Sequence, residues 1–213
     1  MSSLVINEIF FSIQGESTHA GRPCVFVRLT ACDLRCTWCD SEYTFHEGTK
    51  RTVDDVLDEV RTHPCDLVEV TGGEPLLQKN VHDLIARLLE EGKTVMIETG
   101  GHRDISTLDP RVLRIVDVKT PSSGESHRVM TENFADLRAT DELKFVVQDR
   151  ADFDFSLEMI RTHGLEGKCA LLFSPVHGVD PADLAKWVME SGVKARLQLQ
   201  LHKILWPEAV RGV

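Results

Sequence analysis

The amino-acid sequence predicts an α/β fold in which parallel β-α-β units form an open or partial barrel. Short runs rich in β-branched residues alternate with longer segments whose apolar side chains recur three and four positions apart. Several of the runs are apolar enough to be covered on both faces, which is typical of parallel strands. About six such strands are too few to close an eight-stranded barrel. In such folds the functional groups gather at the carboxyl ends of the strands.

The chain supplies these elements in order. The expected strands are Leu4–Ile9, Val25–Leu29, Asp66–Val70, Thr94–Glu98, Val112–Val118, Glu142–Val147, Ala170–Phe173 and Ala195–Gln200. The expected helices are Val53–Thr62, Val81–Glu90, Phe153–Thr162 and Pro181–Glu190. Two helix starts carry local signals, because Thr52 can cap the first helix and Asp180 stands before a proline at the first helical position.

Length and composition set broad limits on function. The 213 residues suffice for one domain, and no repeat or Pro/Gly/Ser-rich linker divides residues 1–213. A formal net charge of -10 opposes direct binding to nucleic acid, because phosphate contacts need concentrated Lys and Arg. No segment is long and apolar enough to span a membrane, and the N-terminus lacks the features of a secretory signal. We therefore expect a cytoplasmic protein.

Three of the six cysteines lie within eight positions, at Cys32, Cys36 and Cys39. With no oxidising compartment indicated, they are interpreted as metal ligands rather than disulfide partners. Zinc is one alternative, with His46 or water as the fourth ligand. An iron–sulfur cluster is the other, although clusters normally take four cysteines. Three protein thiolates would leave one iron open to another molecule.

The Cys-x3-Cys-x2-Cys spacing, with Trp38 before the last cysteine, resembles the signature of radical S-adenosylmethionine enzymes. A second motif, Thr-Gly-Gly-Glu-Pro at Thr71–Pro75, follows an expected strand and resembles the Gly-Gly-Glu motif of the same superfamily. On the residues alone, the two glycines expose backbone groups and Glu74 can accept a hydrogen bond from an ammonium group. A tight turn between strand and helix would have the same composition.

This resemblance implies a partial (β/α)6-type barrel and a 4Fe–4S cluster held by the three cysteines. It also implies that S-adenosylmethionine chelates the fourth iron, so that the cofactor supplies the missing ligand. An electron from the cluster would then cleave the cofactor to a 5′-deoxyadenosyl radical, which abstracts hydrogen from the substrate.

More specific features lie at the two ends of the chain. The segment Ile13–Glu16, "IQGE", precedes the expected strand that holds Arg28. Its amide and carboxylate, together with Arg28, suit a heterocycle that carries an acid, although a polar turn with a structural arginine is the alternative. Combined with Asp40-Ser41 after the cysteines and with the closing Arg211–Val213, these residues resemble the 7-carboxy-7-deazaguanine synthase family over nearly the whole chain.

The second resemblance implies a lyase that contracts 6-carboxy-5,6,7,8-tetrahydropterin to 7-carboxy-7-deazaguanine with loss of ammonia, in queuosine and 7-deazapurine biosynthesis. It implies substrate contacts from Ile13, Gln14, Gly15, Arg28 and Thr71, to which position and chemistry add Glu16, His202 and Val213. The expected cofactor contacts are Trp38, Cys39, Asp40, Gly73, Glu74, Glu98, Lys119 and Ser122. Ser41 matches a position that binds Mg²⁺, which keeps waters and takes substrate oxygens.

No side chain is expected to form a covalent intermediate. A reductant protein such as flavodoxin is the implied electron source, and a homodimer is the implied assembly. Where relatives carry a Ser-Pro-Lys type of sequence, this chain has Asp117 two positions before Lys119, which we expect to change the local hydrogen bonding. His46 and His177 are lone histidines, which are more often structural than catalytic.

Two other interpretations remain open from the sequence. A glycyl-radical-enzyme activase would share the cysteine and Gly-Gly-Glu motifs, but it would not need the Ile13–Glu16 segment with Arg28. A non-catalytic iron–sulfur or zinc module would need four protein ligands and no cofactor pocket.

Overall fold

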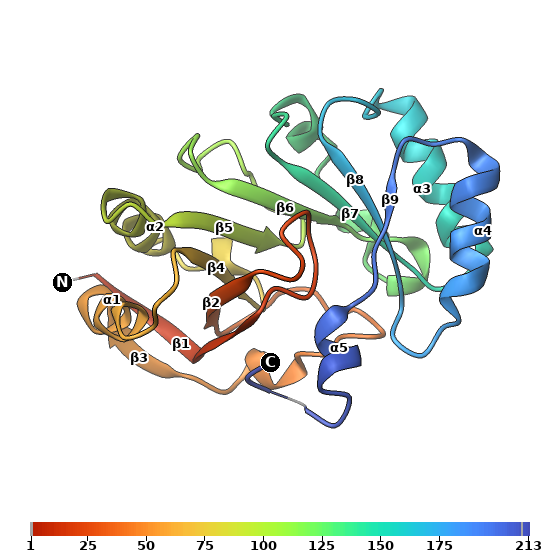
Figure 1. Ribbon diagram of the computed structural model, residues 1–213. Coiled ribbons are helices and arrows are strands. Elements are labelled where there is room, and N and C mark those ends of the chain that lie inside the picture. Colours follow the sequence, from red (N-terminus) through yellow and green to blue (C-terminus); the bar gives the residue numbers. More distant parts are fainter. Residues whose placement is uncertain (1, 210) are drawn as a thin grey trace.

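The structure, a computed structural model, describes residues 2–209 and 211–213. Within these residues nine strands form one sheet, in the order β3-β1-β2-β4-β5-β6-β7-β8-β9 (Figure 1). Neighbouring strands from β2 through β9 run parallel, whereas β1 is antiparallel to both β2 and β3. Because β3 and β9 are separate edges, the sheet stays open, and the predicted α/β partial barrel is confirmed.

The elements have the following bounds. The strands are β1 (Ser3–Ile13), β2 (Pro23–Leu29), β3 (Thr49–Thr52), β4 (Leu67–Gly72), β5 (Thr94–Thr99), β6 (Leu113–Val118), β7 (Glu142–Val147), β8 (Ala170–Pro175) and β9 (Arg196–Leu197). The α-helices are α1 (Val53–Arg61), α2 (Val81–Glu90), α3 (Arg150–Thr162), α4 (Pro181–Ser191) and α5 (Leu201–Leu205). Short 3-10 helices are η1 (Glu42–Phe45), η2 (Pro75–Leu77), η3 (Pro121–Ser123), η4 (Ser126–Arg128) and η5 (Thr131–Ala135).

Two helix starts behave as predicted. The Thr52 hydroxyl accepts a hydrogen bond from the Asp55 N–H at 3.1 Å, and the Asp55 carboxylate accepts one from the Thr52 N–H at 3.1 Å. This reciprocal pair is a capping box. The Asp180 carboxylate accepts a hydrogen bond from the Ala182 N–H at 2.9 Å, with Pro181 at the first helical position.

The two faces of the sheet have different chemistry. Because alternate residues of a strand point to opposite faces, the outward set of apolar side chains packs beneath α1 to α4, which cover the outside of the barrel (Figure 1). The inward set begins with an apolar layer, formed by Phe10, Cys24, Phe26, Leu67, Met96 and Ile115. Further along the same strands the inward residues are polar or charged: Arg28, Glu69, Thr71, Glu98, Asp117, Lys144 and Ser174. The strand ends therefore surround a polar space above an apolar floor.

Several boundaries differ from expectation. β1 continues beyond the predicted end at Ile9, because its last residues pair in antiparallel register with Pro23–Phe26 of β2. α3 begins at Arg150 instead of Phe153, because the Asp149 carboxylate caps its first turn. β3 was not predicted from the sequence, since its four polar residues become a strand only by pairing with β1.

The C-terminal prediction is wrong in extent. Only Arg196–Leu197 of the expected strand Ala195–Gln200 pair with β8, and the chain then turns into α5. The Leu201 N–H donates a hydrogen bond to the Gly15 carbonyl at 3.0 Å, which holds α5 against the segment after β1. α5 and the C-terminus consequently lie at the open side of the barrel (Figure 1).

Candidate active site

A cavity of about 230 Å³ lies inside the open barrel at the carboxyl ends of the parallel strands. Its walls come from β1, β2 and β4 through β8, from the cysteine loop between β2 and η1, and from α5 and the C-terminal residue. The cavity therefore combines residues from both ends of the chain.

Most residues predicted for substrate, cofactor or metal binding line this cavity. They are Ile13, Gln14, Gly15, Glu16, Arg28, Cys32, Cys36, Trp38, Cys39, Asp40, Ser41, Thr71, Gly73, Glu98, Lys119, His202 and Val213. The predicted cofactor residues Glu74 and Ser122 are outside the lining, and so is His46, the alternative zinc ligand. His177 does line the cavity.

Glu74 is held by donors from the neighbouring strand end and turn. Its side chain is fully buried, and its carboxylate accepts hydrogen bonds from the Thr99 hydroxyl at 2.9 Å, the Gly100 N–H at 2.9 Å and the Leu76 N–H at 3.0 Å. His102 Nδ1 lies 3.6 Å from the same carboxylate. These contacts join the ends of β4 and β5 beside the cavity, and contact between Glu74 and a cofactor stays a prediction.

Ser122 contacts two neighbouring segments through its backbone, and its predicted contact with the cofactor stays a prediction. Its N–H donates to the Asp152 carboxylate at 2.9 Å, and its carbonyl accepts a hydrogen bond from the Thr37 hydroxyl at 2.7 Å. The Thr37 N–H donates to the neighbouring Ser123 carbonyl at 3.1 Å. Ser122 therefore belongs to the support of the cysteine loop and is one step removed from the cavity.

A partly buried carboxylate fixes the other side of the cysteine loop. Asp33 accepts hydrogen bonds from Arg103 at 2.6 Å and Arg128 at 2.9 Å, and its other oxygen lies 2.7 Å from His102 Nε2. Partial burial alone would raise the pKa of Asp33, but these three partners hold that pKa well below its usual range. The loop is thus tied to the β5–β6 connection and to η4.

The turn after β4 packs directly against the start of the cysteine loop. A Cβ added to Gly73 would lie only 2.3 Å from the Ala31 carbonyl oxygen and 2.7 Å from Cys32 Cβ. The Glu74 N–H donates to the same Ala31 carbonyl at 2.8 Å. Ala31 itself has a φ of 80°, a left-handed conformation that costs a non-glycine residue about 1–2 kcal/mol. The second glycine of the motif is thus required by close backbone approach.

The three thiols fit a cluster better than they fit zinc. Burial raises the pKa of the Cys36 thiol to about 11, so this group stays protonated until a metal displaces the proton. Among the described residues, no three His, Cys, Asp or Glu side chains, the three cysteines included, lie close enough together to hold a single metal ion. The thiols share one cavity wall, and the fourth ligand that zinc would take from His46 is outside it. A donor set of three sulfurs facing open space suits a cluster with one iron left for another molecule.

Two polar atoms in the cavity also point to a ligand. Asp117 Oδ1 and the Ser174 hydroxyl are buried and have no hydrogen-bond partner within the part of the chain that the structure describes. Buried polar groups normally have such partners, so both atoms suit contact with a bound molecule. The other Asp117 oxygen accepts a hydrogen bond from Lys119 Nζ at 2.7 Å.

Arg28 is held in place from one side only. Its Nε donates to the Glu8 carboxylate at 2.8 Å, and the Tyr43 hydroxyl donates to the same oxygen at 3.0 Å. Burial alone would lower the pKa of Arg28, but Tyr43 and Glu8 raise it. The two terminal nitrogens have no bond to this pair, so the guanidinium can still present a two-pronged face to a carboxylate.

Gln14 and Glu16 form the opposite wall. Gln14 Nε2 donates to the buried carboxyl group of Glu69, and its amide oxygen accepts a hydrogen bond from the Glu16 N–H at 2.9 Å. Glu16 accepts hydrogen bonds from Lys144 Nζ at 2.8 Å and from Gln200 Nε2 at 3.0 Å. Burial alone would raise the pKa of Glu16, but Lys144 and the other donors lower it.

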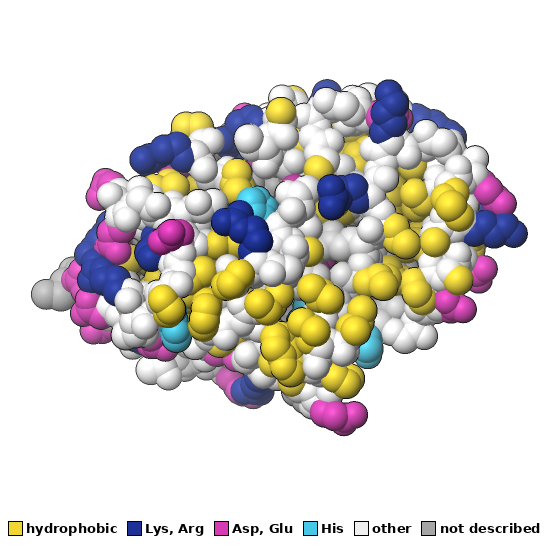
Figure 2. All heavy atoms as spheres, viewed as in Figure 1, with side chains coloured by type: hydrophobic (Ala, Val, Ile, Leu, Met, Phe, Trp, Pro, Cys, Tyr) yellow, Lys and Arg dark blue, Asp and Glu magenta, His cyan; other side chains and the backbone are white. Residues whose placement is uncertain are grey.

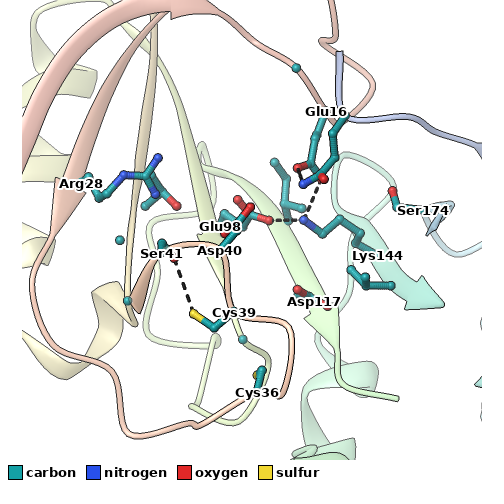
Figure 3. Close-up of a pocket in the computed structure, with 18 of the residues that line it drawn as sticks. Glu16, Arg28, Cys36, Cys39, Asp40, Ser41, Glu98, Asp117, Lys144 and Ser174 are labelled. Carbon is teal, nitrogen blue, oxygen red and sulfur yellow. Dashed lines mark hydrogen bonds and ion pairs between the residues drawn. The ribbon is translucent and has the colours of Figure 1, made fainter. Parts of the chain in front are cut away.

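Sequence reasoning missed Lys144 and Glu69. Figure 3 shows Lys144 between Glu16 and Glu98, with its ammonium group bonded to both carboxylates. Each missed residue is a charged side chain between two apolar neighbours of a strand, in "LKF" of β7 and "VEV" of β4 respectively. A charged side chain on the inward face of a buried strand was the signal that could have identified them.

The C-terminal tail completes the cavity. The Arg211 guanidinium makes two hydrogen bonds to the Glu47 carboxylate, at 2.7 and 3.0 Å, and lies 4.0 Å from the centre of the Tyr43 ring. Val213 then reaches the cavity wall. Gly15 packs so closely on His202 that an added Cβ would lie 2.1 Å from its Nδ1.

Comparisons with known proteins identify the family of this chain. Residues 27–119 match the sequence profile of the Radical SAM superfamily. The chain is 47% identical to a 7-carboxy-7-deazaguanine synthase of Koribacter versatilis, over 98% of this chain and 99% of the relative, and 43% identical to one of Chlorobaculum tepidum, over 99% and 97%. The fold is similar to that of QueE from Escherichia coli, with a TM-score of 0.80 at 22% identity, covering 94% of this chain and 95% of that structure. The chain therefore belongs to the 7-carboxy-7-deazaguanine synthase family of the radical SAM superfamily.

Proposed function

We propose that this protein is a lyase that contracts the ring of 6-carboxy-5,6,7,8-tetrahydropterin to 7-carboxy-7-deazaguanine, with loss of ammonia. The observation that carries the proposal is the meeting of three cysteine thiols and the Gln14, Glu16 and Arg28 side chains in one cavity. The full-length similarity to synthases of that name supports it.

Cys32, Cys36 and Cys39 would hold the 4Fe–4S cluster, and S-adenosylmethionine would lie between the cysteine loop and the ends of β4 to β6. When bound, the cluster and this cofactor supply a 5′-deoxyadenosyl radical that removes hydrogen from the substrate. The protein's own residues position the reactants, because an error of an ångström in such a reaction can cost orders of magnitude in rate.

Arg28 would bind the carboxylate of the pterin through its two terminal nitrogens. Glu8 and Tyr43 hold the guanidinium from behind, so binding costs little side-chain entropy. Glu16 would accept hydrogen bonds from the N–H groups of the ring, because its ionised oxygens retain further acceptor capacity beside Lys144 and Gln200. Val213 and α5 would cover the substrate from the open side of the barrel.

Ser41 is the proposed protein ligand of Mg²⁺. Its side chain lines the cavity beside Asp40, on the same side as Arg28 (Figure 3). A single hydroxyl suffices because Mg²⁺ retains waters and takes oxygens from a substrate carboxylate. Removing divalent metal with a chelator should abolish turnover, and added Mg²⁺ should restore it.

The proposal extends to organisation and partners. Residues 1–213 would act as one domain, supported by a sheet and a cavity that use both ends of the chain. A homodimer is supported by exposed apolar side chains, and Figure 2 shows such side chains gathered over the region of β9 and α5. The exposed apolar residues of this part of the chain are Leu197, Leu199, Ile204, Leu205 and Trp206. A reductant protein such as a flavodoxin would supply electrons in the cytoplasm. No helix among the described residues is long and apolar enough to cross a membrane.

The decisive experiment is an anaerobic assay of the reconstituted protein with the carboxylated tetrahydropterin, S-adenosylmethionine and Mg²⁺, analysed by mass spectrometry. We expect 7-carboxy-7-deazaguanine and ammonia. A Cys36→Ala variant prepared in parallel should lack both the cluster absorbance and the product. A wild-type protein that contains no iron, or that leaves the pterin unchanged, would contradict the proposal.

A further inference from the structure

One buried lysine connects the two halves of the cavity. Lys144 Nζ lies 2.8 Å from Glu16 Oε2, and it also donates to Glu98 Oε1 (Figure 3). The lysine side chain is 6% exposed, and the register of β7 places it opposite Asp117 on β6. Three carboxylates from three separate segments thus face one ammonium group.

The contact between Lys144 and Glu16 crosses the interior of the barrel. Glu16 follows β1, whereas Lys144 is on β7, and β2, β4, β5 and β6 lie between these strands in the sheet. A second tie joins the same loop to the same strand, because the Thr18 hydroxyl and N–H both donate to the Glu142 carboxylate. Of these two contacts between the loop and β7, only the one made by Lys144 also includes Glu98, a predicted cofactor residue.

A purely structural role does not explain this arrangement. Buried ion pairs seldom stabilise a fold relative to apolar residues of similar size, so they call for another reason. Both carboxylates that Lys144 contacts line the cavity, and both would be left facing each other without a counter-charge if the lysine were absent. The other titratable groups around this point are Glu69 on β4, Glu98 on β5, Asp117 on β6, His202 on α5, and Glu16 and Lys119 in the loops after β1 and β6.

We propose that Lys144 is a positioning residue that keeps Glu16 ionised and aimed at the substrate while it holds Glu98 toward the cofactor. The inference rests on the proposed function, because that function makes Glu16 a substrate ligand and Glu98 a cofactor neighbour. Lys144 is therefore a charge shared by the two binding sites.

This role predicts a specific pH dependence. In the wild-type protein Lys144 keeps Glu16 ionised through the neutral range, so pterin affinity should stay constant from pH 6.5 to 8.5. Replacing the lysine by methionine removes the positive charge and raises the pKa of Glu16, since the Glu16 and Glu98 carboxylates then face each other without a counter-charge. Glu16 then gains a proton as the pH falls and can no longer accept fully from the ring N–H groups.

The test measures pterin and S-adenosylmethionine affinities of the anaerobically reconstituted protein between pH 6.5 and 9.5. K144M should bind the pterin at least about tenfold more weakly at pH 7, the equivalent of one lost charge-assisted hydrogen bond, and should recover affinity toward pH 9.5. K144R retains the charge and should stay closer to wild type. The double variant K144M/E98Q removes the facing carboxylate and should restore part of the affinity.

Thr18→Val is the matched control, because it weakens the other tie of the loop to β7 without changing any charge. Any loss in T18V should be the same at every pH. A K144M variant with wild-type pterin affinity, or with a pH-independent loss like that of T18V, would overturn the role of Lys144. If K144M does not fold, the pterin affinity of K144M/E98Q is measured over the same pH range. Wild-type affinity, or a loss that does not depend on pH, in that variant would also overturn the role of Lys144. Wild-type protein that binds no pterin would overturn the proposed function along with this inference.

Discussion

The close approach of the Gly73 turn to the cysteine loop makes Gly73→Ala a sharp test of the site. An added Cβ would stand 2.3 Å from the Ala31 carbonyl oxygen, which is about 0.7 Å short of the 3.0 Å that real contacts respect. The neighbour is backbone and cannot rotate away. Two hydrogen bonds fix the same place, from the Gly73 N–H to the Leu29 carbonyl at 3.2 Å and from the Glu74 N–H to the Ala31 carbonyl at 2.8 Å.

The size of the effect follows from these contacts. Overpacking costs about 1–3 kcal/mol, and each strained hydrogen bond adds about 1 kcal/mol. We therefore expect G73A to lose about 3–5 kcal/mol of unfolding free energy in urea, and to retain less iron per chain after reconstitution. Gly92→Ala is the control, because Gly92 has a φ of 78° and open space around it, so alanine there costs about 1–2 kcal/mol of backbone strain far from the cavity. Full iron content and unchanged S-adenosylmethionine affinity in G73A would refute the reasoning.

Three further predictions test other parts of the site. Glu74→Gln should lower the unfolding free energy by about 1–3 kcal/mol, because an amide –NH2 would face the donors Thr99 and Gly100. The control is Glu90→Gln, which changes an exposed side chain and should leave the unfolding free energy unchanged. Glu16→Gln should lower the melting temperature near neutral pH, because it removes the charge that Lys144 binds. The pKa of Glu16 in the folded protein is below its ordinary 4.5, so the ionised group stabilises the fold at every pH above about 4.5. The difference in melting temperature between the variant and the wild type should therefore disappear only below about pH 4.5. Deleting Arg211–Val213 should weaken pterin binding about tenfold, the scale of one lost charge-assisted contact, and unchanged affinity would show that the tail does not cover the substrate.

Local sequence patterns were sufficient to predict most of the strands and α-helices, and to predict the motifs whose residues are contiguous in the chain. The capping box at Thr52 depends on residues three positions apart, and the cysteine loop and the Gly-Gly-Glu turn are each contiguous. What could not be predicted depends on pairing across the fold. β3 forms only because its residues pair with β1. The last predicted strand is shorter than expected because the chain turns into α5, where the Leu201 N–H donates a hydrogen bond to the Gly15 carbonyl.

The role of Glu74 shows the same limit within the site. Its motif predicted an acceptor close to the cofactor, and the turn is indeed beside the cavity. The donors that surround its carboxylate, however, come from Thr99 and Gly100, which follow it by about 25 residues along the chain. Whether a motif carboxylate meets a ligand or a neighbouring strand is decided by this packing, which no spacing within the motif contains.

The charge balance of the inner face explains why one lysine matters so much there. Glu16, Glu69, Glu98 and Asp117 put four carboxyl groups around the part of the cavity where Lys119 and Lys144 provide two ammonium groups. Burial raises the pKa of Glu69 well above its ordinary value, and the negative charges of Glu98 and Glu16 raise it further. Even without Glu69, three carboxylates face two ammonium groups, which is an excess of negative charge in a desolvated space. Such an excess favours the binding of a cationic sulfonium cofactor and of a substrate rich in N–H donors. Each ligand would reduce the repulsion between Glu16 and Glu98, which Lys144 offsets by binding both carboxylates.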